Sequence, residues 1–151
     1  MKIRYAGDAD FDFVLSGRKE IARAEGFRIP DLAREKKRVN EAISGKRVRV
    51  AVEDGKAAGF LWFAVSEETP FGIDYGEFGM KYCWVDYVFT APGKRGRGVG
   101  TALYEDVTEI ARKKGAKKIM CDVFTVNKAS AAFHSRIGFK PLLGIYWRDC
   151  R

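Results

Sequence analysis

The 151-residue sequence predicts an α/β fold in a single domain, 1–151, with a mixed, mostly antiparallel sheet and helices on both faces. Two observations predict it. Residues 82–124 run from an apolar segment through a glycine-rich loop and a helical segment into a second apolar segment. Such a crossover makes its two strands a parallel β-α-β pair, which we expect at the centre of the sheet. Asp54 and Gly55 join two more strand-like segments by a two-residue turn, which predicts an antiparallel hairpin.

The first 45 residues predict a strand and two helices. Residues 2–6 form a short strand, and a first helix follows to about residue 25, where Gly26 ends it. Pro30 can begin a second helix, and Gly45 fits its C-terminal side. The apolar side chains of this helix that we expect to face inward are Leu32, Val39 and Ile43.

The middle of the chain predicts the hairpin and a long acidic loop. Residues 46–53 alternate apolar and charged side chains, as a half-buried strand does, and residues 56–66 are more uniformly apolar. Residues 67–79 carry four acidic residues, no basic residue, three glycines and one proline. One hypothesis is that this loop attracts a cationic amine. The alternatives are a plain acidic surface or a dimer contact through its aromatic side chains.

The remaining residues predict three strands and two helices. The strands span 82–90, 118–124 and 140–147, and the helices span 99–114 and 127–136. In the first of these strands, regular alternation places Asp86 and Val88 on one face, and Val85, Tyr87 and Phe89 on the other.

Composition excludes several classes of protein. The 46% hydrophobic and 32% charged residues are typical of a soluble globular protein rather than a disordered one. No run of about 18 apolar residues occurs, so we expect no membrane span, and the N-terminus lacks the apolar segment of a secretory signal. The three cysteines form no CxxC pair. We therefore expect free thiols, a cytoplasmic protein and no metal site.

The net charge of +8 lies in the second half of the chain. Residues 81–151 carry 14 Lys or Arg and 6 Asp or Glu, a net +8, whereas residues 1–80 carry 14 of each. A basic field attracts a polyanion such as nucleic acid or a phosphorylated cofactor. Within this half, residues 93–101 read GKRGRGVGT, with four glycines and three cations between a strand and a helix. That arrangement is typical of a phosphate-binding helix entrance.

Three phosphate-binding patterns compete for this stretch. A P-loop requires a lysine where the sequence has Val99, and a dinucleotide-binding GxGxxG requires a glycine where it has Thr101. The third pattern, [QR]xxGx[GA], fits residues 95–100. About 30 residues later, residues 127–139 read NKASAAFHSRIGF, which fits N-x-x-A-x-x-F-Y-x-x-x-G-F except at Ser130 and His134. In both motifs the sequence resembles the GNAT superfamily of acyl-CoA-dependent N-acyltransferases.

The resemblance implies a GNAT-like fold, acetyl-CoA as the acyl donor, a primary amine as the acceptor and no metal. In this family the glycine-rich loop binds the coenzyme A pyrophosphate, and the main chain at the end of the preceding strand holds the pantetheine and the acetyl carbonyl. The cofactor-binding residues it implies here are Phe89, Thr90, Arg95, Gly96, Arg97, Gly98, Val99, Gly100, Thr101, Asn127, Ser130 and Phe133.

Two residues are expected to carry the proton transfers. His134 stands where the family usually has a tyrosine that protonates the departing thiolate, and its imidazole titrates near neutral pH. Tyr87 and Tyr146 are alternatives for this acid. Asp86 is a single acid in the apolar strand 82–90, where burial without a purpose is costly. It could act as the base or orient the amine, and Asp122 raises the same question.

Two other functions remain open from the sequence. The departure at His134 permits a catalytically silent CoA-binding sensor. The basic half of the chain permits a nucleic-acid-binding module, although its cations lie at both ends of one helix and not in one stripe. The sequence does not identify the amine acceptor, and it does not decide whether the protein forms a homodimer.

Overall fold

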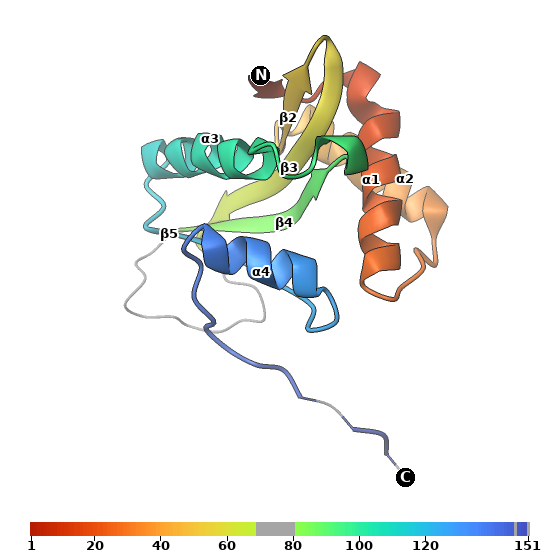
Figure 1. Cartoon of the computed structure of the whole chain (residues 1–151), viewed down its shortest axis with the longest axis vertical. Coiled ribbons are helices and arrows are strands. Elements are labelled where there is room, and N and C mark those ends of the chain that lie inside the picture. The colour runs from red at the N-terminus through yellow and green to blue at the C-terminus, as the bar shows by residue number, and fades with distance from the viewer. Residues whose placement is uncertain (69–80, 147, 151) are drawn as a thin grey trace.

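A five-stranded sheet in the order β1-β2-β3-β4-β5 forms the centre of the computed structural model, which describes residues 1–68, 81–146 and 148–150 (Figure 1). Neighbouring strands are antiparallel except β4 and β5, which are parallel. The prediction of a mixed, mostly antiparallel sheet is therefore confirmed. The strands are β1 (Lys2–Tyr5), β2 (Val48–Glu53), β3 (Lys56–Ser66), β4 (Tyr82–Thr90) and β5 (Lys118–Cys121).

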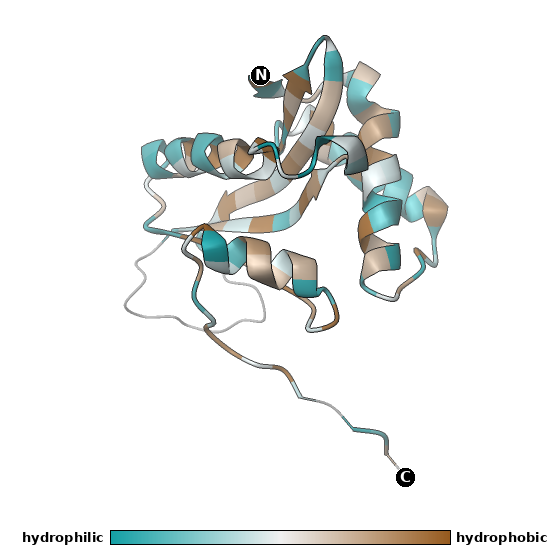
Figure 2. Cartoon of the chain, in the orientation of Figure 1, coloured by the Kyte–Doolittle hydropathy of each residue, from teal (hydrophilic) through white to brown (hydrophobic). Residues whose placement is uncertain are grey.

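Helices cover both faces of this sheet, as predicted. They are α1 (Phe11–Ala24), α2 (Leu32–Ser44), α3 (Val99–Lys113) and α4 (Lys128–Arg136). Apolar residues of α1 and α2 pack on one face of the sheet and those of α3 on the other, where α4 contributes Phe133. The outer surface of α3 is hydrophilic (Figure 2). None of the helices in the described ranges combines the length and apolarity needed to cross a membrane.

The caps and turns follow the local sequence closely. Asp31 caps α2, because its Oδ1 accepts a hydrogen bond from the Arg34 N–H at 2.9 Å. Both residues of the Asp54–Gly55 turn have positive φ, as a two-residue hairpin of this twist requires. Within α2, Val39 and Ile43 are buried as predicted. The prediction for Leu32 is wrong, because Leu32 lies in the first turn of the helix and is 41% exposed.

A β-bulge interrupts β4. Trp62 of β3 pairs with Tyr87, but the next residue along β3 pairs with Val85, so Asp86 is an extra residue without a partner on β3. The bulge resets the alternation of side chains. Val85 packs on the α3 side of the sheet, whereas Tyr87 and Phe89 pack on the α1 and α2 side. The prediction that these three residues share a face is therefore wrong.

The end of the chain differs from the prediction. β5 ends at Cys121, three residues early, and residues 140–146 form no strand. Ile145 and Tyr146 are 71% and 95% exposed, and the segment runs away from the domain (Figure 1). The parallel pair consequently lies at the edge of the described sheet and not at its centre.

Candidate functional site

The glycine-rich loop connects β4 to α3 and depends on two left-handed glycines. Gly96 has φ +73° and Gly98 has φ +80°, a backbone region that residues with a side chain rarely adopt. Gly98 is the N-cap residue of α3. The following Val99 is 1% exposed and anchors the helix start in the core. The loop is thus exposed at its glycines and fixed at both ends.

Successive N–H groups of this loop remain free to bind an anion. Within the described ranges, no N–H from Gly96 to Thr101 donates to a backbone carbonyl, and the first helical bond of α3 runs from the Ala102 N–H to the Gly98 oxygen. No side chain caps α3, and its first turn holds no acidic residue. The positive end of the helix dipole is therefore uncompensated, which is the electrostatic requirement for binding phosphate.

The cations of the loop have roles of their own. The Arg95 Nε donates to the Thr90 carbonyl at 3.2 Å, so this side chain closes the loop onto the end of β4. The Lys94 Nζ lies 3.1 Å from the Glu53 Oε2 and joins the loop to the β2–β3 hairpin. Arg97 is exposed. The free donors of this loop are therefore mainly backbone N–H groups.

β4 and β5 separate before the glycine-rich loop begins. The parallel pairing ends at Val85 and Cys121, while β4 continues for five more residues to Thr90. One edge of β4 beyond the bulge therefore has no strand neighbour among the described residues. Its N–H and C=O groups on that edge can bond an extended ligand arm, as an added strand would.

The middle of α4 lies beside the start of α3. A Cβ atom on Gly100 would come within 2.9 Å of the Phe133 ring, so only glycine allows this approach. Asn127 caps α4, because its Oδ1 accepts the Ser130 N–H at 3.1 Å. The structure thus brings Phe133 and the glycine-rich loop together, while Asn127 and Ser130 bond to one another.

His134 lies between α4 and α3 and is 5% exposed. Its Nδ1 lies 2.8 Å from the Ser130 carbonyl oxygen, which can only accept, so Nδ1 carries the proton. Its Nε2 then accepts from the Tyr104 hydroxyl at 2.7 Å. Burial lowers the pKa of the imidazole, although the bond to Ser130 opposes this. These contacts describe a neutral histidine that joins two helices, and they leave no ring nitrogen free.

We expect His134→Leu to lower the free energy of unfolding by about 1–3 kcal/mol at pH 8, because the Tyr104 hydroxyl loses its acceptor. A histidine with a lowered pKa stabilises the fold fully above its unfolded pKa of about 6.5 and less as the pH falls below it. The difference between wild type and variant in urea unfolding should therefore shrink at pH 5.5. Tyr104→Phe, which keeps the titrating group, should retain the pH dependence. A constant difference would contradict this interpretation.

Asp86 occupies a charged environment at the bulge. Burial raises the pKa of its carboxyl group above the ordinary value, and nearby Asp122 adds to this, while Arg38, Arg47 and Arg18 lower it. The outcome is a pKa above the ordinary value of a carboxyl group, the direction expected for a carboxylate that accepts a proton as a base.

A second acid lies close to the same region. Burial followed by repulsion from Asp122 raises the pKa of Glu25, at the end of α1. The rings of Phe27 and Phe124, from the loops that follow α1 and β5, are 4.9 Å apart. The loop after α1 and the loop after β5 therefore contact each other, and Glu25 and Asp122 lie close to this pair of aromatic rings.

Sequence reasoning missed three charged residues of α1 and α2 that lie close to Tyr87, the residue after Asp86. Arg18 and Glu35 are buried and joined by an ion pair of 2.8 Å, and Arg38 is bonded to the same glutamate. A signal was available, because Glu35 lies four residues before buried Val39, on the inward stripe of α2.

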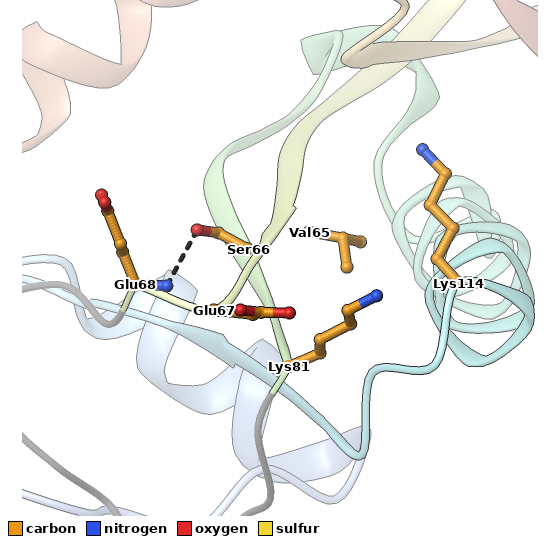
Figure 3. A pocket seen from close by; sticks show the side chains of 6 residues that line it. All are labelled: Val65, Ser66, Glu67, Glu68, Lys81 and Lys114. Atoms are coloured by element: carbon orange, nitrogen blue, oxygen red, sulfur yellow. Dashed lines mark hydrogen bonds between the residues drawn. The ribbon is translucent and has the colours of Figure 1, made fainter.

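The acidic loop can be judged only at its first residues, since residues 69–80 lie outside the described ranges. Glu67 and Glu68 line an open pocket with Lys81 and Lys114, in which Ser66 accepts the Glu68 N–H at 3.0 Å (Figure 3). Lys114 lies at the C-terminal end of α3, roughly 22 Å along the helix from the glycine-rich loop. This pocket is therefore separate from the loop.

The cysteines and the clusters of acidic residues offer no further chemistry in the described ranges. Cys83, Cys121 and Cys150 are free, as predicted, and burial raises the pKa of the Cys121 thiol to about 11. Such a thiol is unreactive at neutral pH. In the described ranges, no three His, Cys, Asp or Glu side chains gather in a way that could hold a metal ion.

Comparison with known proteins identifies relatives. The model of the acetyltransferase (GNAT) family matches residues 18–139, most of the chain. An uncharacterized N-acetyltransferase of Methanocaldococcus jannaschii is 40% identical over 53 residues, which are 35% of this chain and 24% of that protein. Streptothricin acetyltransferase of Streptomyces lavendulae is 30% identical over 94 residues, 62% of this chain and 44% of that protein. The chain thus spans less than half of the length of these relatives.

The fold has close counterparts among solved structures. Aminoglycoside N-acetyltransferase AAC(6')-Iy, solved in complex with CoA, superimposes with a TM-score of 0.77 at 20% identity. The match covers 99% of this chain and 95% of that one. At this identity the likeness establishes the architecture alone.

Proposed function

Because the chain belongs to the GNAT family of acetyltransferases, we propose that it transfers the acetyl group of acetyl-CoA directly to a primary amine, with residues 1–151 acting as one domain. The observation that carries the proposal is the row of free N–H groups from Gly96 to Thr101 at the uncapped start of α3. This row can bind the two negatively charged phosphates of the pyrophosphate. Arg95 and Val99 support the shape of the loop, and exposed Arg97 adds a positive charge beside it.

The thioester end of acetyl-CoA would lie along β4. The open edge of this strand beyond Asp86, including the main chain of Thr90, offers hydrogen bonds to the pantetheine and the acetyl carbonyl. The main chain of Phe89, which the sequence also suggested, faces β3, because Ala91 donates to Ala58 and main-chain groups alternate in direction along a strand. Asn127, Ser130 and Phe133 at the start of α4 complete the proposed binding surface. A hydrogen bond to the carbonyl oxygen stabilises the negative charge that develops there as the amine attacks.

Asp86 is the proposed base. The amine attacks in its neutral form, after its ammonium form has lost a proton to solvent. Its nitrogen bonds to the carbonyl carbon, the carbon–sulfur bond breaks, and CoA leaves as a thiolate that takes a proton from solvent. The remaining proton on the nitrogen passes to the Asp86 carboxylate directly or through water. The raised pKa of Asp86 supports this role. The contacts of His134 support a structural role over that of the acid expected from the sequence, because donation to the thiolate would require the bond to Tyr104 to break.

The acceptor is proposed to be a cationic amine of a small molecule or protein. Asp86, Asp122 and Glu25 provide negative charge near the proposed acetyl position. Streptothricin and aminoglycosides, after which two of the similar acetyltransferases are named, are amines of this kind. A cytoplasmic location and a homodimer remain predictions of the sequence, the latter measurable by sedimentation.

The purified chain should release CoA thiol from acetyl-CoA when a suitable amine is present. The panel would contain an aminoglycoside, streptothricin, a polyamine and a lysine peptide, with mass spectrometry to detect the acetylated amine. Omission of the amine is the control. CoA binding without thiol release across a broad panel would instead favour a silent CoA-binding sensor, to which the engaged ring nitrogens of His134 lend support.

A further inference from the structure

Glu35 of α2 joins buried Arg18 to half-buried Arg38. It is 4% exposed, its Oε1 accepts from the Arg18 Nε at 2.8 Å, and its Oε2 accepts from an Arg38 guanidinium nitrogen at 3.1 Å. Buried ion pairs often contribute little net stability, because desolvating the charges costs as much as the attraction returns. Stability alone is therefore a weak reason for this arrangement.

Both arginines bind the same side chain, Tyr87 of β4. The Arg18 guanidinium carbon lies 3.3 Å from the centroid of the Tyr87 ring, and Arg38 donates to the Tyr87 hydroxyl at 3.3 Å. Trp62 of β3 packs edge-to-face on the same ring at 5.3 Å. Groups from α1, α2 and β3 thus hold one phenol ring.

Tyr87 directly follows the bulge residue Asp86. Asp86 has no partner on β3, and the pairing with β5 ends one residue before it. The ladder therefore leaves Asp86 unpaired on both sides. The position of its carboxylate depends on how firmly the neighbouring residues are held.

We propose that Arg18, Glu35 and Arg38 are positioning residues that hold Tyr87 and so fix the carboxylate of Asp86 at the bulge. The proposal rests on the proposed function, in which Asp86 is the base. A base placed within hydrogen-bond reach of the amine must be held firmly, because small displacements cost rate. The helices α1 and α2 therefore act on the reaction through the Tyr87 ring.

Arg38 also contributes its charge. After burial, Arg38 has the largest influence on the pKa of Asp86, and it lowers that pKa. Removing its charge should raise the pKa further, so the carboxylate would protonate at a higher pH. The other charged or titratable groups that face this carboxyl or its neighbours are Arg18, Glu25, Glu35, Arg47, Cys83, Tyr87 and Asp122.

The test is a carboxyl ¹³C NMR titration of the full chain, with the Asp86 signal assigned by its loss in Asp86→Asn. In Arg38→Met the midpoint should rise by about half to one pH unit. The matched control is Arg34→Met, which removes an exposed charge from the same helix and should leave the midpoint unchanged. The acid limb of kcat should move in parallel.

A second variant tests the positioning without changing charge. Tyr87→Phe keeps the stacked ring but removes the hydroxyl that Arg38 bonds, so kcat should fall roughly three- to tenfold with the KM for acetyl-CoA unchanged. This variant decides the proposal if Arg38→Met does not fold. Identical Asp86 midpoints in both arginine variants, or a wild-type kcat in Tyr87→Phe, would overturn it. Failure of the proposed function would give a different result. The wild-type protein would then acetylate no amine, while the titration midpoint of Asp86 would still rise in Arg38→Met.

Discussion

Gly98→Val should weaken the binding of CoA by about 10- to 100-fold. A β-branched residue at φ +80° carries a strain of roughly 1–3 kcal/mol, and the loop relieves it only by turning its N–H groups away from a common centre. Calorimetric titration with CoA measures the effect. The melting temperature should change less, because Gly98 is exposed and no atom lies within 4 Å of the added Cβ.

Two variants of the same loop serve as controls. Gly93→Val adds the same side chain where φ is not left-handed and where the Cβ also meets no atom within 4 Å, so binding should change little. Arg97→Ala should cost less than about fivefold, the scale of an exposed ion pair. If Arg97→Ala weakens CoA binding more than Gly98→Val does, the arginine and not the backbone binds the pyrophosphate.

Asp86→Asn should lower kcat by about 100- to 10,000-fold, the usual contribution of a positioned base. The base works as the carboxylate, so wild-type kcat should fall as the pH drops through the raised pKa of Asp86. The amide cannot titrate, and the variant should lose this limb of the profile. Steady-state kinetics at saturating acetyl-CoA and amine from pH 5 to 9 measure both effects.

Asp122→Asn is the matched control, because it removes an exposed carboxylate that lies near Asp86, directly after the end of β5. It should shift the acid limb slightly to lower pH, since it removes a repulsion that raises the Asp86 pKa, and it should leave most of kcat intact. A larger loss of kcat in Asp122→Asn than in Asp86→Asn would assign the base to Asp122.

Local signals predicted most of the fold. The Asp54–Gly55 turn, the cap at Asn127 and the glycines after the helices each act within a few residues, so the sequence could place these boundaries. The glycine-rich loop was predictable for the same reason. Its conformational requirement lies in the glycines themselves, although the sequence could not separate left-handed Gly98 from Gly100, which is needed for the approach of Phe133.

Features that depend on distant partners were not predictable. The bulge at Asp86 arises from the register between β3 and β4, which no single strand displays. The contact of His134 with Tyr104 joins residues thirty positions apart. The predicted last strand failed because an apolar pattern shows that a segment can be a strand but not that a neighbour is available to pair with it.

The extra residue in β4 resembles an in-frame insertion. Deletion of Asp86 would make Val85 and Tyr87 consecutive, and these two residues already pair with consecutive residues of β3 and already lie on opposite faces of the sheet. Tyr87 and Phe89 would therefore stay on the α1 and α2 side, where Arg18 and Arg38 contact the Tyr87 ring. A one-residue deletion at this position would thus remove the carboxylate and the break in the strand ladder, while the other side chains of β4 keep their faces.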